Sequence, residues 1–130
     1  MPRAYTVATA AVALQVPAKW IDNTLSHYNV QGVSQARQGV SRRLTIQSLS
    51  ILSIALKLIH ELALPVERAL IISTRLLAAD GSLSFAEGLK VEINVEQNMA
   101  QLLERLEHAV EVAPLPRRGR PPEKTTGRLD

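Results

Sequence analysis

Cysteine is absent from the chain of 130 residues. Its absence excludes a disulfide framework, a zinc site with cysteine ligands and a catalytic thiol. Aromatic residues are also scarce, at 3% of the chain, although 46% of the residues are hydrophobic. The core must therefore consist of Leu, Ile, Val and Ala, a composition typical of packed small helices. We expect one folding unit with an appendage, mainly α-helical with a small β contribution.

A long hydrophobic run is missing as well. The most apolar segment, residues 46–64, contains three serines and the charged residues Lys57 and Glu61. It falls short of the roughly 20 apolar residues that a membrane span needs, so we predict a buried helix and no membrane partner. The Ala- and Val-rich segment after Arg3 is interrupted by Thr6 and Thr9. This pattern favours a helix capped by Thr6 over a secretory signal, and we expect a cytoplasmic protein.

Catalytic constellations are not evident in the sequence. No Gly-rich phosphate loop occurs, and His27, His60 and His108 fall in three different predicted elements. A single histidine on a helix is more often a surface or core-edge residue than a catalyst. The sequence therefore predicts a protein that is not an enzyme and that has no cofactor, no metal and no small-molecule substrate.

Charge is segregated along the chain. Residues 1–79 hold eight Lys and Arg against three acids, a balance of +5, whereas residues 80–111 hold two against seven, a balance of −5. From residue 112 to the end, five basic residues face two acids, a balance of +3. A polyanion would bind the two basic ends. We therefore divide the chain into a basic N-terminal domain (1–79), which the motifs below assign to DNA binding, an acidic module (80–112) and a basic tail (113–130) that we expect to be disordered.

Two short helices with a tight connection are predicted near the N-terminus. Apolar residues at helical spacing follow Thr6 as far as Leu14, and Pro17 then opens a second helix that ends near His27. This order of elements is typical of a helix-turn-helix motif. In the second helix the periodicity directs one face to the core, formed by Trp20, Ile21 and Leu25.

The opposite face of the second helix carries side chains that can contact DNA. It is predicted to present Lys19, Asn23 and Thr24. Asn can read adenine edges, and Lys can contact guanine or phosphate. An exposed polar helix face is by default only solvated, so this pattern alone leaves both interpretations open.

A short hairpin or wing is predicted next, from residue 34 to residue 44, with its turn at Gln38-Gly39. Thr45 then caps a long helix. At this point the chain resembles the winged-helix domain of MerR-type transcriptional regulators over about residues 4–75. The matching residues are Tyr5-Thr6-Val7, Ala10-Ala11, Leu14, Val16, Arg37, Gly39, Arg42-Arg43-Leu44-Thr45 and Leu64-Pro65-Val66.

In the MerR family the second helix enters the major groove and the wing contacts the DNA backbone. The resemblance therefore implies a winged helix-turn-helix fold, with Arg42 as the strongest single DNA contact. By position it implies DNA contacts for Lys19, Asn23, Arg37, Arg42 and Arg43.

The acidic module is predicted to contain a half-buried β-hairpin and an amphipathic helix. Asp80-Gly81 stops the preceding helix, and strands on either side of a Glu87-Gly88 turn extend to Val95. A helix from about Gln97 to Val112 follows. Its apolar face comprises Met99, Leu102, Leu103, Leu106, Ala109 and Val110. That face must pack either on the helix of residues 46–62 or on a second copy of the module, and we favour a homodimer.

The tail contains Arg117-Arg118-Gly119-Arg120-Pro121-Pro122, which resembles the AT-hook. A glycine lets such a backbone press against the floor of a narrow minor groove, and the flanking arginines extend into its negative potential. Narrow grooves occur in A·T-rich DNA. The resemblance implies minor-groove contacts for Arg117, Arg118, Gly119, Arg120 and Pro121. A generic basic tail and a localisation signal are the alternatives.

These features predict a DNA-binding transcriptional regulator, a repressor associated with the nucleoid, whose partner is A·T-rich double-stranded DNA. Two alternatives remain. The end of the second helix reads Asn23-Thr24-Leu25-Ser26-His27, without the Arg and Tyr usual in the family, and this suits an architectural nucleoid protein that reads groove width. A protein-interaction adaptor with a basic localisation tail is the other.

Deletion of residues 113–130 tests the tail. We expect the shortened chain to fold and to lose affinity mainly for A·T-rich duplexes. The reason is that the arginine side chains bind most favourably in a narrow minor groove, where the negative potential is enhanced. The measurement is a titration of both proteins against A·T-rich and G·C-rich duplexes. An equal loss on both duplexes would show that the tail is only a generic basic segment.

Overall fold

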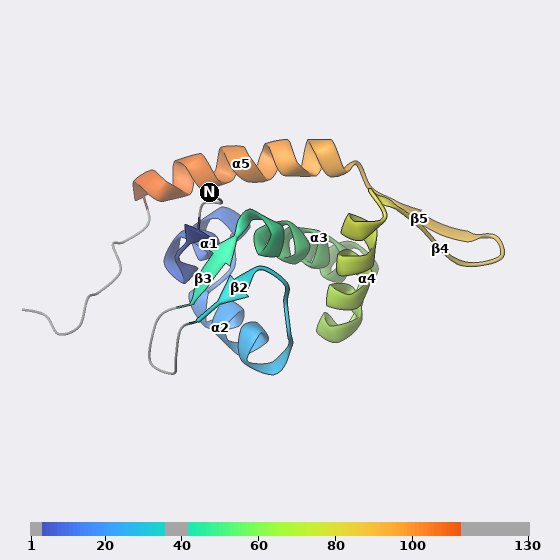
Figure 1. Cartoon of the computed structure of the whole chain (residues 1–130), viewed down its shortest axis with the longest axis horizontal. Helices are drawn as coiled ribbons and strands as arrows, with labels where there is room; N and C mark the ends of the chain where they lie inside the picture. The colour runs from blue at the N-terminus through green and yellow to red at the C-terminus, as the bar shows by residue number, and fades with distance from the viewer. Residues whose placement is uncertain (1–3, 36–41, 113–130) are drawn as a thin grey trace, which may run out of the picture.

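Helices make up most of the computed structural model (Figure 1), which describes residues 4–35 and 42–112, with side chains as far as residue 110. Within these ranges the chain forms five helices and five short strands. The class predicted from composition, mainly α with small antiparallel sheets, is confirmed. In chain order the elements are β1 (Ala4–Tyr5), α1 (Val7–Leu14), α2 (Ala18–His27), β2 (Val33–Ser34), β3 (Arg43–Thr45), α3 (Ile46–Leu62), α4 (Val66–Ala78), β4 (Ser82–Ala86), β5 (Leu89–Glu92) and α5 (Val95–Val112).

The first helix begins at the predicted cap, and the second begins one residue later than predicted. The Thr6 side chain accepts a hydrogen bond from the Thr9 backbone N–H (3.1 Å), which satisfies a free donor at the start of α1. Gln15 ends α1 in a left-handed conformation, with φ of 60°. Pro17 is the N-cap of α2, one residue earlier than its predicted place inside the helix. The connection between the two helices is therefore only three residues long.

A three-stranded antiparallel sheet with the order β1-β3-β2 connects this pair of helices to α3. Leu44 in the central strand pairs with Tyr5 on one side and Val33 on the other. The predicted hairpin is thus confirmed at its base, with strands shifted by one residue. Its turn, Gln38-Gly39, lies outside the described residues.

Gly32 fixes the junction between this sheet and α3. Its φ of 88° is unfavourable for other residues, and a Cβ at this position would collide with the Thr45 side chain. The Gly32 carbonyl oxygen accepts hydrogen bonds from the Thr45 backbone N–H (3.0 Å) and hydroxyl (2.9 Å). The Thr45 hydroxyl in turn accepts from the Ser48 backbone N–H (3.4 Å) and caps α3. Strand β3 is thereby held rigidly at the start of α3.

Helix α3 is the centre of the core, as its apolar sequence predicts. It packs against α4, α5, α1 and β3. Its fully buried side chains include Leu49, Ile51, Leu52 and Ile54. Its buried serines have partners, since the Ser48 hydroxyl donates to the Thr45 carbonyl oxygen (2.8 Å) and the Ser50 hydroxyl contacts the Met99 sulfur (3.7 Å). Among the helices in residues 4–35 and 42–112, none is both long enough and apolar enough to cross a bilayer.

Helix α5 begins two residues earlier than predicted, so Val95 belongs to the helix and not to a strand. The cause is Asn94, whose side-chain oxygen accepts a hydrogen bond from the Gln97 backbone N–H (2.9 Å) and caps the helix. The helix runs across α1 and α3 and contacts α1 most extensively (Figure 1). It buries Leu102, Leu106 and Ala109 there. Most of the predicted apolar face of α5 therefore packs against other helices of the same chain.

The hairpin of β4 and β5 extends away from the helices (Figure 1). At its base the Gly81 carbonyl oxygen accepts a hydrogen bond from the Ile93 backbone N–H (2.8 Å). Phe85 lies against the guanidinium group of Arg75 on α4, 5.7 Å from the ring centre. Leu83, Val91 and Ile93 pack partly against the core, whereas Leu89 and most of the outer hairpin are exposed. The predicted half-burial is confirmed only near the base.

Neighbouring leucines of α5 provide a matched test of this packing. Leu106 is 1% exposed and Leu103 is 48% exposed. Leu106→Ala should lower the free energy of unfolding by roughly 2–5 kcal/mol, because it leaves a cavity against the core. Leu103→Ala should change it by about 0.5 kcal/mol or less. Urea unfolding of both variants gives the comparison, and similar losses would show that α5 does not pack as described.

Candidate nucleic-acid interface

Helix α2 presents two of the three predicted DNA-contacting side chains to solvent. Lys19 and Asn23 are both exposed and lie one helical turn apart on the same face. Within the described ranges neither side chain makes a hydrogen bond or an ion pair. Both are therefore available to an external ligand.

Thr24 is the exception, and its predicted exposure is wrong. Its side chain is buried, with 5% exposed. The reason is helical geometry, because Thr24 follows Ile21 by three residues and Trp20 by four, and such neighbours share a face. The buried face of α2 is therefore wider than its apolar residues indicate. Thr24 is removed from the candidate interface.

Arg42, the strongest candidate in the sequence, is held against α2 by two contacts. Its guanidinium donates to the Asp22 carboxylate (3.2 Å) and to the Ser26 hydroxyl (3.1 Å). The Ser26 hydroxyl donates in turn to the Asp22 carbonyl oxygen (2.8 Å). The Arg42 side chain is 22% exposed and that of Asp22 is 51% exposed. At this exposure the ion pair contributes on the order of 0–1 kcal/mol to stability.

The Arg42 contacts have two further consequences. A guanidinium has five N–H donors, so the group retains donors for a second partner. The positive charge of Arg42 also neutralises Asp22, the only acid in α2. Without this contact, the Asp22 carboxylate would repel a polyanion that approached the helix.

Arg43, the residue after Arg42, is a further exposed basic side chain. It is exposed on β3, on the face of the strand opposite the buried Leu44. We use the name α2–β3 face for the four predicted contacts Lys19, Asn23, Arg42 and Arg43. Among its side chains and the neighbouring Asp22, three positive charges face one negative charge. Arg37 and the tail residues Arg117, Arg118, Gly119, Arg120 and Pro121 lie outside the described residues.

Acidic side chains gather elsewhere on the molecule. Helix α5 lies on the opposite side of the molecule from α2 (Figure 1) and exposes Glu96, Glu104 and Glu107. The charge segregation of the sequence is thus also a segregation in space. A polyanion at the α2–β3 face would keep its distance from these acids. In the part of the chain that the structure describes, no group of three or more His, Asp or Glu side chains is placed to hold a metal.

The Arg42–Asp22–Ser26 contact was not foreseen from the sequence. Asp22 and Ser26 belong to α2, whereas Arg42 lies just before β3 and follows Asp22 by 20 residues. The only signal was Asp22 itself, an isolated acid on an otherwise basic surface. Comparisons of the chain with protein-family models, with curated proteins and with solved structures found no match. The MerR-type resemblance therefore rests on the motifs within the sequence.

Proposed function

We propose that the protein is a DNA-binding transcriptional regulator, a repressor with winged helix-turn-helix architecture. The observation that carries the proposal is the α2–β3 face, where Lys19 and Asn23 are exposed on α2 and Arg42, just before β3, forms an ion pair with Asp22 on the same helix. The order of elements supports it, since two helices with a three-residue connection precede an antiparallel pair of strands and a long helix. In this proposal residues 34–44 correspond to the wing.

Helix α2 would lie in the major groove, which is wide enough to admit a helix. Asn23 would donate and accept hydrogen bonds at an adenine edge, and Lys19 would contact a guanine or a phosphate. These two side chains are the base-reading part of the interface. Both are exposed and unengaged within the described residues.

Arg42 and Arg43 would contact phosphates and fix the orientation of α2. Arg42 is well placed for this role because Asp22 and Ser26 already hold its side chain. A side chain that is ordered before binding loses less conformational entropy on contact with DNA. Arg37 would add a phosphate contact from the wing.

The tail would bind the adjacent minor groove of A·T-rich DNA through its Arg-Gly-Arg-Pro core. It follows α5 directly, so it is tethered to the domain that reads the major groove. Tethering converts the second contact into an intramolecular event and raises the overall affinity. The protein would then reside in the cytoplasm on the nucleoid.

A homodimer would double both contacts. The main apolar face of α5 packs against other helices of the same chain. The dimer surface would therefore have to come from apolar side chains that remain exposed. These are Leu62, Ile71, Phe85, Leu89, Leu103 and Val110. They lie on α3, α4, the hairpin and α5.

One observation favours an architectural DNA-binding protein as a second candidate. Thr24 is buried, so the α2–β3 face has only Lys19 and Asn23 for base readout. Binding would then depend mainly on phosphate contacts and groove width. Many regularly spaced protected sites on genomic DNA would indicate the architectural protein, and a few discrete sites would indicate the repressor.

Replacement of Arg42 and Arg43 by Ala tests the α2–β3 face. We expect weaker binding to duplex DNA and a flatter salt dependence, because each lost phosphate contact lowers the slope of log K against log salt by about 0.9. Fluorescence anisotropy at several salt concentrations measures both quantities.

The control is Arg68→Ala, which removes an exposed arginine from α4, away from the face. Its slope should equal that of the unchanged protein. If the double variant binds like the control, the face is not the DNA-contacting surface.

A further inference from the structure

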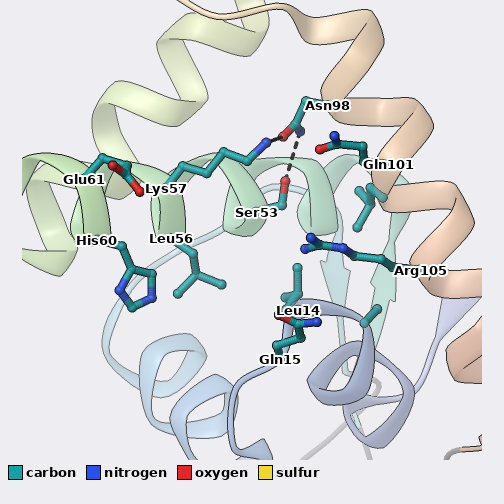
Figure 2. Close-up of a pocket in the computed structure, with 12 residues that line it drawn as sticks. Leu14, Gln15, Ser53, Leu56, Lys57, His60, Glu61, Asn98, Gln101 and Arg105 are labelled. Carbon is teal, nitrogen blue, oxygen red and sulfur yellow. Dashed lines mark hydrogen bonds between the residues drawn. The ribbon is translucent and has the colours of Figure 1, made fainter.

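A pocket with a mixed polar and apolar lining lies between α3, α5 and the C-terminal end of α1 (Figure 2). Its volume is about 410 Å³. We call it the α3–α5 pocket. Its polar lining residues include Gln15, Lys57, His60, Asn98, Gln101 and Arg105. None of these residues belongs to the α2–β3 face.

Helical spacing brings these side chains together. Asn98, Gln101 and Arg105 lie three and four residues apart, so they share one face of α5. On α3, Lys57 and His60 are three residues apart and occupy the facing surface in the same way. The two helices contact each other, and each contributes at least one basic side chain to the pocket.

Asn98 holds the Lys57 ammonium group in place. The Asn98 side chain is among the buried polar groups, with 7% exposed. Its amide oxygen accepts a hydrogen bond from the Lys57 ammonium, and its amide nitrogen donates to the Ser53 hydroxyl (2.9 Å). Because the partner of Lys57 is a neutral amide, the positive charge of the ammonium group is not neutralised. Among the described side chains, two of its three N–H donors have no partner.

Arg105 brings a second positive charge to the pocket. Figure 2 shows its side chain reaching from α5 toward Leu14 at the end of α1. Within residues 4–35 and 42–110, the Arg105 guanidinium has no ion pair or hydrogen bond. Among the described residues, Glu61 is the one acid in the lining of the pocket, and it forms no ion pair with either cation. Two unneutralised cations therefore face the same space.

The rest of the lining limits the kind of ligand. Leu14, Leu56 and Leu102 provide an apolar wall, and Gln101 adds an amide donor. A guanidinium and an ammonium group together match the oxygens of a carboxylate or a phosphate. We propose that the α3–α5 pocket binds a small organic anion that carries a carboxylate or phosphate group on a short apolar body. The proposal does not depend on DNA binding.

Titration of the full-length protein with two probes, inorganic phosphate and sodium pentanoate, tests this proposal. The readout is the NMR signal of the Asn98 side-chain amide and the Arg105 side-chain N–H. We expect saturable shifts with at least one probe, and none with sodium chloride at the same ionic strength. Saturation by phosphate alone identifies a phosphate ligand, and saturation by pentanoate alone identifies a carboxylate.

Arg105→Gln should weaken the binding of the saturating probe by about tenfold, because a charge-assisted hydrogen bond is lost. Arg105 is exposed, so the variant should keep the backbone spectrum of the folded protein. Arg68→Gln removes an arginine from α4 outside the pocket and should leave the binding unchanged. Equal shifts with chloride, no saturation with either probe, or unchanged binding by Arg105→Gln would each overturn the proposal.

Discussion

The burial of α3 on most of its sides is the constraint on which the rest of the structure depends. Helices α1, α4 and α5 and strand β3 all pack against it. Thr45 is the last residue of β3 and the N-cap of α3. It contacts Gly32 so closely that a side chain at position 32 would collide with it. The position of α3 therefore determines the position of β3. Through Arg42 and Asp22 it also restrains β3 relative to α2.

This arrangement explains how a small core can support a charged surface. The apolar side chains of α1, α2 and α3 pack in the core. Polar side chains on α2 and β3 are therefore exposed and available to a ligand. The acidic side chains of α5 lie on the other side of the molecule (Figure 1). Such a separation gives the molecule a directional field, which can orient a polyanion before contact.

Local patterns predicted much of the fold. Caps at Thr6 and Thr45 and the Glu87-Gly88 turn each placed an element correctly, and Pro17 placed the start of α2 to within one residue. Capping and turn chemistry act within a few residues, so local patterns reveal them. The error at Val95 had a similar local cause. Alternating apolar residues extended the predicted strand, but the cap formed by Asn94 ended it.

Contacts between distant residues could not be read from such patterns. Three features join segments that are far apart in the sequence. They are the packing of α5 on α1, the contacts of Arg42 with α2 and the α3–α5 pocket. The burial of Thr24 was missed because a polar residue on the edge of an apolar face gives no periodic signal. For the candidate site, the sequence identified the exposed residues Lys19, Asn23 and Arg43 but not how Arg42 is held.

Backbone NMR of the full-length protein with an A·T-rich duplex shows whether the α2–β3 face contacts DNA. We expect the amide signals of Lys19, Asn23 and Arg43 to shift on binding, while those of Ile71 on α4 and Leu89 on the hairpin stay in place. Shifts confined to α4, α5 or the hairpin, or the absence of any shift on the α2–β3 face, would rule out DNA contact at this face.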